Sequence, residues 1–134
     1  MKHFLVTTAL ICRGVLALAQ SADLTTQIKH ADSMLFSVGY NHCDTTVFEN
    51  ILSSDFEFWH DQSGITSGKR AFIASVRDGL CQLPYRARRV SIDTSIMVYP
   101  MYRNHELYAA VQHGEHHFYA LYSGKAPVRT STAS

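Results

Sequence analysis

The sequence predicts an α+β domain in which helices come first and antiparallel strands follow. Apolar residues recur three and four apart over residues 22–43 and again over residues 68–80, which is typical of amphipathic helices. Between them, residues 55–61 (DFEFWHD) alternate with period two and are rich in aromatic side chains, which predicts a strand. From Tyr85 onward the pattern is that of long strands. A length of 134 residues argues for one domain rather than two.

The first nineteen residues have the composition of a secretory signal peptide. Met1-Lys2-His3 is a short basic start, residues 4–19 are almost wholly apolar or small, and Ala17-Leu18-Ala19 suits signal peptidase. A membrane-spanning helix needs about 20 apolar residues, and this run is shorter and contains Arg13. A buried N-terminal helix is the alternative, but it should show a polar face, which this run lacks. We expect a signal peptide over residues 1–19, a mature domain over residues 20–134, and a periplasmic or secreted protein.

The charge balance gives no reason to expect a nucleic acid or an anionic membrane as a partner. The whole chain has 12 Lys and Arg against 11 Asp and Glu. Residues 1–19 carry Lys2, Arg13 and no acid, so residues 20–134 have 10 basic and 11 acidic side chains and a net charge of −1. Such a near-neutral surface does not attract polyanions over a distance. We therefore expect no nucleic acid and, once the signal is removed, no membrane contact.

Two cysteines of the mature domain, Cys43 and Cys81, form an even pair. In an oxidising compartment such a pair predicts one disulfide, which would stabilise the fold by roughly 3–4 kcal/mol. Two separate buried thiols are the alternative. Neither cysteine belongs to a Cys-x-x-Cys motif or has an evident activating base, which argues against a catalytic thiol.

Three helices are predicted in the first two thirds of the domain. The first covers residues 22–43, the second begins after Asp44 as N-cap and ends near Leu52, and the third covers Gly68–Leu80 with Ser67 as its cap. The inward positions follow the helical spacing: Leu24, Ile28, Ala31, Leu35 and Val38 in the first, and Phe72, Ile73, Val76 and Leu80 in the third.

The strands are predicted mainly in the last third. One long or bent strand covers Arg86–Ile92 and Ile96–Tyr99, with an interruption near Asp93–Ser95. Tyr102–Asn104 is predicted as a turn and Leu107–Tyr122 as a second long strand. Gly124–Pro127 breaks this strand, and residues 128–134 read as a small polar tail.

Several local strings, together with this order of elements, resemble a known family. They are Ile51–Phe58, His60-Asp61, Ser63-Gly64, Gly68-Lys69, Val98–Met101 and Gly114–Tyr119. Over about residues 24–133 the chain resembles the nuclear-transport-factor-2-like superfamily, in its exported SnoaL-like, ketosteroid-isomerase-like branch (domain of unknown function 4440). The resemblance implies a cone-shaped roll of N-terminal helices packed on a curved antiparallel sheet. Members usually continue with two more strands, so we expect a C-terminally truncated cone, or one that a second chain completes as a homodimer.

The resemblance also implies a position for a general base. Related isomerases hold a carboxylate near the end of the first strand, where this chain has Trp59-His60-Asp61. Asp61 or His60 in an apolar pocket could move a proton next to a carbonyl, as in a cofactor-free isomerase, cyclase or dehydratase. The alternative is that Asp61 begins a turn before Gly64 and that His60 pairs locally.

A second group of polar residues lies in the predicted strand Leu107–Tyr122. His113, Glu115 and His117 would share one face, and such side chains can bind zinc. Adjacent side chains on one strand project in parallel and converge poorly on one ion, so we expect no metal and no cofactor. The open end of the cone, lined by Trp59, Asp61, His113, Glu115 and His117 and with Tyr99 as a further contact, would hold a small apolar or aromatic molecule. Gly114 marks a bulge or a close backbone approach.

The remaining cluster is Arg86, Arg88 and Arg89. Arg86 and Arg88 share a face, which an anionic ligand could use, but the neutral balance favours a solvated strand paired with acids. The sequence therefore predicts an exported small-molecule-binding or structural module, with a cofactor-free enzyme and a homodimeric assembly module as alternatives.

Overall fold

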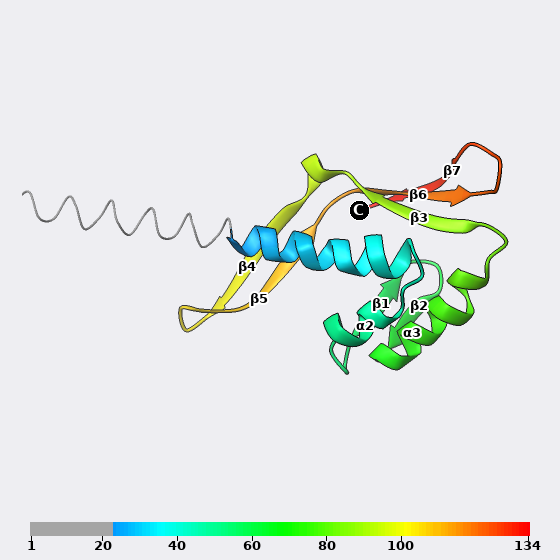
Figure 1. The fold of residues 1–134 in the computed structure, drawn as a ribbon. Coiled ribbons are helices and arrows are strands. Elements are labelled where there is room, and N and C mark those ends of the chain that lie inside the picture. Colours follow the sequence, from blue (N-terminus) through cyan, green and yellow to red (C-terminus); the bar gives the residue numbers. More distant parts are fainter. Residues whose placement is uncertain (1–22) are drawn as a thin grey trace, which may run out of the picture. The chain divides into compact units, whose positions relative to one another are not determined.

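The structure, a computed structural model, describes residues 23–134, so the predicted signal peptide lies outside the described residues. The fold is mixed α+β, as predicted, with helices and antiparallel sheets (Figure 1). The chain divides into two compact units. The described part of the first consists of residues 23–30 and Met97–Gln112, and the second consists of Ala31–Ile96 and His113–Ser134. No helix within residues 23–134 is both long and apolar enough to cross a bilayer.

The predicted first helix is present, but it changes type along its length. Residues 23–32 are α-helical, and η1 (Ser33–Tyr40) is a π-helix. The wider hydrogen-bond register of a π-helix continues at its end, where Asn41 N–H donates to Phe36 O at 2.8 Å. This change rotates the later residues relative to an α-helix, and in η1 the buried residue is Gly39. Ala31, which we expected to face inward, is exposed.

The next two helices begin close to their predicted positions. The α2 helix is Thr46–Ile51 with Thr45 at the N-cap position, so the predicted cap, Asp44, lies one residue too early. Asp44 Oδ1 still accepts a hydrogen bond from Thr46 N–H at 3.1 Å. The α3 helix is Lys69–Asp78, followed by the 3₁₀ turn η2 (Leu80–Gln82). Ser67 is not its cap, because Gly68 holds the N-cap position with φ of 89°, and no side chain caps the helix there.

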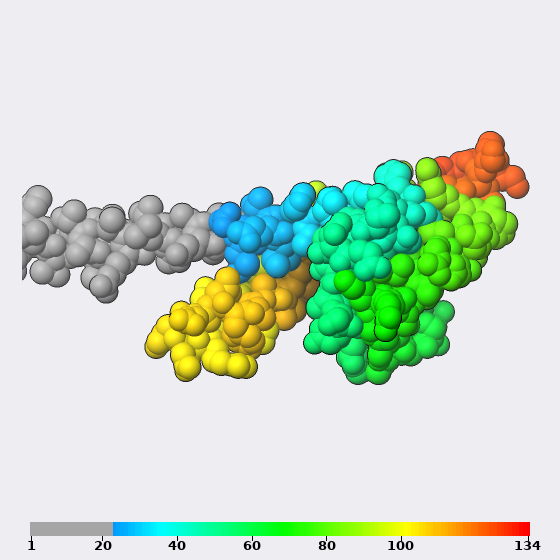
Figure 2. Space-filling view, turned by 60° about the horizontal axis from the view of Figure 1, so that its bottom comes forward, coloured from blue at the N-terminus to red at the C-terminus, as the bar shows by residue number. Residues whose placement is uncertain are grey.

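The hydrophobic core of the second unit lies around α2 and α3, which pack side by side (Figure 2). Its centre is Phe72, whose ring lies 5.2, 5.1 and 5.2 Å from the rings of Phe48, Phe56 and Phe58. Such tilted and edge-on aromatic contacts add to the free energy gained by burying the rings. Phe72, Ile73 and Val76 are buried, as the helical spacing predicted.

A short hairpin packs on this core, and only its first strand was predicted. It is formed by β1 (Glu57–His60) and β2 (Gly64–Ser67), with Trp59 opposite Ile65. We expected residues 62–64 to end the strand and Ser67 to begin a helix. Instead Gly64, with φ of 80°, reverses the chain, and the four residues from Gly64 pair back.

A three-stranded antiparallel sheet forms the rest of the second unit. It has the order β3 (Arg86–Ser91), β6 (His116–Leu121) and β7 (Val128–Ala133), and η1 packs against β3 (Figure 1). The prediction of a polar tail over residues 128–134 was wrong, because these residues pair with β6 although every side chain of β7 is exposed. The expected interruption of the long strand is the 3₁₀ turn η3 (Asp93–Ser95).

The first unit consists mainly of the hairpin of β4 (Met97–Arg103) and β5 (Glu106–His113). Asn104 and His105 join the strands with φ of 50° and 66°. Two residues with positive φ form a type I′ turn, which matches the twist of a hairpin. The turn therefore lies slightly later than predicted, and the predicted strand Leu107–Tyr122 is two strands separated at Gly114 and Glu115.

Candidate functional site

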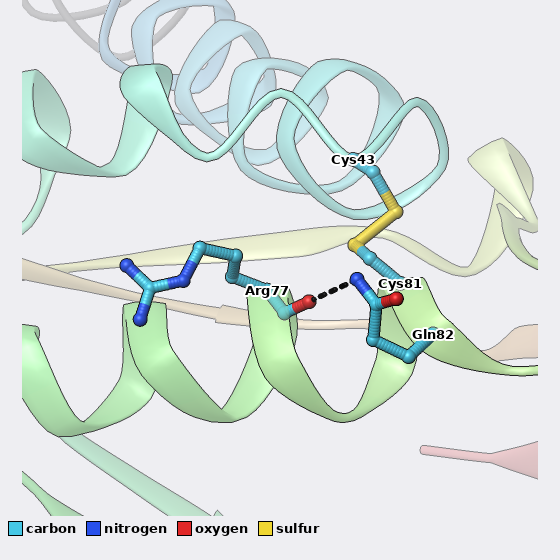
Figure 3. The surroundings of a disulfide bond; sticks show 4 residues. All are labelled: Cys43, Arg77, Cys81 and Gln82. Atoms are coloured by element: carbon cyan, nitrogen blue, oxygen red, sulfur yellow. Dashed lines mark hydrogen bonds between the residues drawn. A yellow bond between two sulfur atoms is a disulfide. The ribbon is translucent and has the colours of Figure 1, made fainter.

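The predicted cysteine pair is bonded in the structure. The Sγ atoms of Cys43 and Cys81 lie 2.12 Å apart and the Cα atoms 5.9 Å apart, across 38 residues of sequence. Figure 3 shows that the bond ties the segment after η1 to η2, next to the hydrogen bond that Gln82 Nε2 donates to Arg77 O at 3.0 Å. Cys43 itself has φ of 57°. The disulfide therefore links the first helix of the unit to the end of α3.

The predicted general base lies in solvent at the end of β1. The Asp61 side chain is 85% exposed, so it is not in an apolar pocket such as the general-base hypothesis requires. His60 Nδ1 accepts hydrogen bonds from Gln62 N–H at 3.1 Å and Ser63 N–H at 3.3 Å. Trp59 is 69% exposed, and its Nε1–H donates to Glu57 at 3.2 Å. The local pairing of His60 within the turn is thus present, and the catalytic role of both residues stays a prediction.

The three polar residues expected on one strand face lie on different segments. His113 ends β5, Glu115 lies in the interruption, and His117 lies in β6, where its Nδ1 is hydrogen-bonded to Thr132 Oγ1 at 3.0 Å. At the break, a Cβ on Gly114 would lie 3.2 Å from Ile96 Cγ1, so the predicted close approach is confirmed. Within residues 23–134 no group of three His, Cys, Asp or Glu side chains could hold a metal ion.

Tyr99, the remaining predicted ligand contact, belongs to the first unit. It lies on β4 with half of its surface exposed, and its hydroxyl donates to Met97 Sδ at 3.3 Å. The five other predicted contacts belong to the second unit. Ligand binding by these six residues therefore stays a prediction.

A buried polar cluster that the sequence pattern did not predict lies between η1 and the sheet. Its centre is Arg89 on β3, whose side chain is 9% exposed and forms an ion pair with Asp32 at 3.2 Å. The guanidinium lies over the ring of Phe36, 3.7 Å from the centroid, and also donates to Ser91 Oγ at 2.9 Å. Asn41 fixes the backbone of the same residue, because its amide donates to Arg89 O at 2.9 Å and its Oδ1 accepts from Arg89 N–H at 2.6 Å.

Two polar atoms of this region are buried without a hydrogen-bond partner within residues 23–134. They are Arg89 Nε and His116 Nδ1. The sheet register places His116 opposite Ser91, two residues along β3 from Arg89, so both side chains lie on the sheet face that η1 covers. Buried polar atoms usually have a partner, and an unpaired one is costly. A polar group placed beside these atoms could therefore satisfy them.

Burial also changes the acid–base behaviour of the residues around this cluster. Desolvation, and next the positive charge of Arg89, lower the pKa of His116. Desolvation raises the pKa of Tyr40, whose ring lies 6.1 Å from the ring of Phe118 on the same sheet face. His116 is thus favoured in its neutral form, and the Tyr40 hydroxyl keeps its proton.

The first unit has the opposite character, because its apolar side chains are open to solvent. The two-residue turn sets Met101 opposite Tyr108 and Tyr102 opposite Leu107, so apolar side chains point to both faces of the hairpin. Figure 2 shows one side of this hairpin in yellow and orange. We call the exposed apolar residues the hairpin patch: Met97, Tyr99, Met101, Tyr102, Leu107, Tyr108 and Val111.

The turn end of the hairpin carries two charged side chains. Arg103 and Glu106 flank the turn, and the guanidinium of Arg103 lies 4.8 Å from the ring centroid of Tyr108. A cation over an aromatic face is attracted by its quadrupole, so this contact supports the tyrosine ring in an exposed position. The hairpin patch therefore ends in a pair of opposite charges.

Comparison of the chain with protein-family models, with curated proteins and with solved structures gave no match.

Proposed function

We propose that the protein is an exported structural module that assembles with a second copy of itself through the hairpin patch. The observation that carries the proposal is that a two-stranded sheet exposes large apolar side chains on both of its faces. An isolated two-stranded hairpin is at best marginally stable in water, and contiguous exposed apolar surface marks an interaction site. Tyr102, the most exposed residue of the patch, is 62% accessible.

A second copy is the partner that suits this surface. The seven side chains expose on the order of 700 Å² in total, taking about 150–250 Å² for each whole aromatic side chain, and they divide between the two faces of the hairpin. Tyr102, Leu107 and Val111 share one face, which would be the apolar centre of the contact. A specific dimer buries about 800 Å² per partner, with an apolar centre and a polar rim. A twofold interface is self-complementary, because the same surface of each copy meets that of the other. Tyrosine and methionine, which supply five of the fifteen residues of the two strands, are enriched in such interfaces.

Two further parts of the proposal rest on the second unit. A disulfide between Cys43 and Cys81 fits an extracellular or other oxidising compartment, which supports export. The order of helices, short hairpin, third helix and antiparallel strands supports the cone-shaped roll of the nuclear-transport-factor-2-like branch.

The experiment is a measurement of mass in solution. Sedimentation of the purified chain at micromolar concentration should give a dimer, and the double variant Tyr102→Glu/Leu107→Glu should give a monomer. Charged side chains in a desolvated apolar contact are strongly unfavourable, so the loss should exceed tenfold in dissociation constant. Trp59→Glu/Ile65→Glu is the matched control, since it changes an exposed apolar pair of the other hairpin. A monomeric wild type, or a dimer that survives the Tyr102/Leu107 change, would refute the assembly.

Binding of a small molecule is the second candidate, and the buried atoms Arg89 Nε and His116 Nδ1 favour it. A ligand that accepts a hydrogen bond from the guanidinium and exchanges one with the imidazole would satisfy both atoms. Native mass spectrometry of the exported protein should then detect a small bound molecule, and His116→Leu should remove it. A wild-type spectrum that contains only the polypeptide mass would exclude this candidate.

A further inference from the structure

The β3–β6–β7 sheet has a second face, which η1 does not cover. Side chains alternate along each strand, so the residues next to Arg89 and Ser91 on β3 point away from η1. These are Arg86, Arg88 and Val90, all of them exposed. The register brings Tyr119 of β6 opposite Arg88. The pairing of β7 shifts between Phe118 and Tyr119, so that Arg129 rather than Thr130 lies opposite Tyr119 and on its face.

Three arginines therefore lie on one face of one sheet. Arg88 and Arg129 flank Tyr119 in a row across the three strands, and Arg86 is two residues from Arg88 along β3. The expected pairing of Arg86 and Arg88 with acids was wrong, because no ion pair to these residues or to Arg129 is found in the described part of the chain. The guanidinium groups are thus free to bind an external anion.

The acids nearest in sequence lie beyond the far ends of the strands. Asp93 follows β3 after Ser91, and Glu115 precedes β6. The arginine row is at the other end of the face, separated from these acids by the row of Val90, His117 and Thr132. We call the surface formed by Arg86, Arg88, Tyr119 and Arg129 the arginine face.

We propose that the arginine face binds a polysaccharide that carries sulfate or carboxylate groups along its chain. Neighbouring same-face positions lie about 7 Å apart along a strand, and positions two strands apart lie about 10 Å apart across the sheet. Cations at these separations can contact different anionic groups of one extended polymer. Guanidinium groups match the geometry of planar and tetrahedral oxyanions and bind them through two hydrogen bonds.

The aromatic content of the face favours a polysaccharide over single-stranded nucleic acid. Binding of single strands relies on aromatic side chains on which successive bases stack. The arginine face has one aromatic residue, Tyr119, which is half-buried and packs against His117 with the ring centroids 6.4 Å apart. The disulfide also fits a compartment in which acidic polysaccharides are met.

The experiment measures binding of the purified chain to heparin, with uncharged dextran and a thymidine oligonucleotide as further probes. The variant is Arg86→Gln/Arg88→Gln/Arg129→Gln. Its matched control, Lys29→Gln/Arg70→Gln/Arg77→Gln, removes the same charge from exposed positions outside this sheet. Heparin should bind the wild type and the control equally, and about tenfold more weakly the arginine variant, with affinity falling as salt rises.

Each outcome decides the proposal. Absence of heparin binding, or equal binding by the arginine variant, would overturn it, and so would equal affinity for dextran. Tighter, arginine-dependent binding of the oligonucleotide would assign the face to nucleic acid instead. The dimer mass of the arginine variant is measured in parallel, because an unchanged dimer separates failure here from failure of the assembly proposed above.

Discussion

The guanidinium of Arg89 lies 3.7 Å from the centroid of the Phe36 ring and so joins the sheet to η1. The same side chain forms the ion pair with Asp32, whose side chain is 17% exposed. An Arg side chain in this position contributes apolar packing, a cation–π contact and a charge pair at once. The contact between the helix and the sheet therefore includes a buried polar residue beside the aromatic contact of Tyr40 with Phe118.

We predict that Arg89→Met destabilises the protein by about 3 kcal/mol, because the substitution removes the half of a largely buried ion pair that offsets the cost of desolvating the Asp32 carboxylate. Chemical denaturation followed by circular dichroism measures the free energy of unfolding. Arg88→Met is the matched control, since Arg88 is its exposed neighbour on the opposite face, and the change should stay within about 0.5 kcal/mol. Equal effects of the two substitutions would contradict the structural role of Arg89.

The buried position of Arg89 could have been inferred from the alternation of side chains between the two faces of the strand. Ala87, Arg89 and Ser91 share one strand face, and two small neighbours indicate a face that a helix approaches closely. Arg86, Arg88 and Arg89 are close in sequence, but a strand places adjacent residues on opposite faces, so they do not form one cluster. The partner Asp32 lies 57 residues earlier, and no local pattern links the two.

The helices and the aromatic core could be predicted because burial leaves a periodic pattern. Phe72, Ile73 and Val76 follow the spacing of a helix that packs on a core. The strand β7 leaves no such pattern, because all of its side chains are exposed and only its backbone pairs with β6. The close approach of Gly114 to Ile96 could not be predicted either, because the two residues are distant in sequence.

Gly39 is the next position at which a substitution tests the packing. A Cβ at Gly39 would lie 2.3 Å from Phe48 Cε1 and 2.9 Å from Val47 Cγ1, and both of these side chains are buried. Alanine normally favours a helix over glycine by about 1 kcal/mol, but overpacking a core costs about 1–3 kcal/mol. We predict that Gly39→Ala lowers the free energy of unfolding by about 2 kcal/mol. Ser37→Ala, at an exposed position of the same helix, should be neutral, and a stabilising Gly39→Ala would disprove this packing.

The disulfide gives a third prediction. Because the bond closes a loop across 38 residues, the double variant Cys43→Ser/Cys81→Ser should lose about 4 kcal/mol of stability through the greater entropy of its unfolded chain. Thermal unfolding of the oxidised and reduced wild type checks the same quantity without a substitution. Mass spectrometry of a non-reduced digest should contain the peptide pair linked through Cys43 and Cys81. Two unlinked peptides with free thiols would refute the bond.

The lowered pKa of His116 predicts a pH dependence of stability. Since the folded state holds the imidazole neutral, the unfolded state binds more protons below the ordinary His pKa of 6.5. The contribution of His116 is therefore fully present above pH 6.5 and is lost as the pH falls toward its folded pKa. The charged and titratable neighbours that act on it are Arg89, Asp32 and His117. Free energies of unfolding between pH 5 and 8 should fall more steeply toward acid for the wild type than for His116→Gln.

The control for this prediction is His117→Gln, which removes the adjacent histidine of the opposite sheet face. This substitution leaves His116 beside Arg89 under η1, so the free energy of unfolding should still fall as the pH is lowered. The six other histidines of the chain are unchanged in both variants. A difference between the two profiles of unfolding free energy against pH therefore comes from positions 116 and 117. If His116→Gln and His117→Gln give the same slope between pH 5 and 6.5, the desolvation of His116 by the η1–β3 contact is not what governs stability in this range.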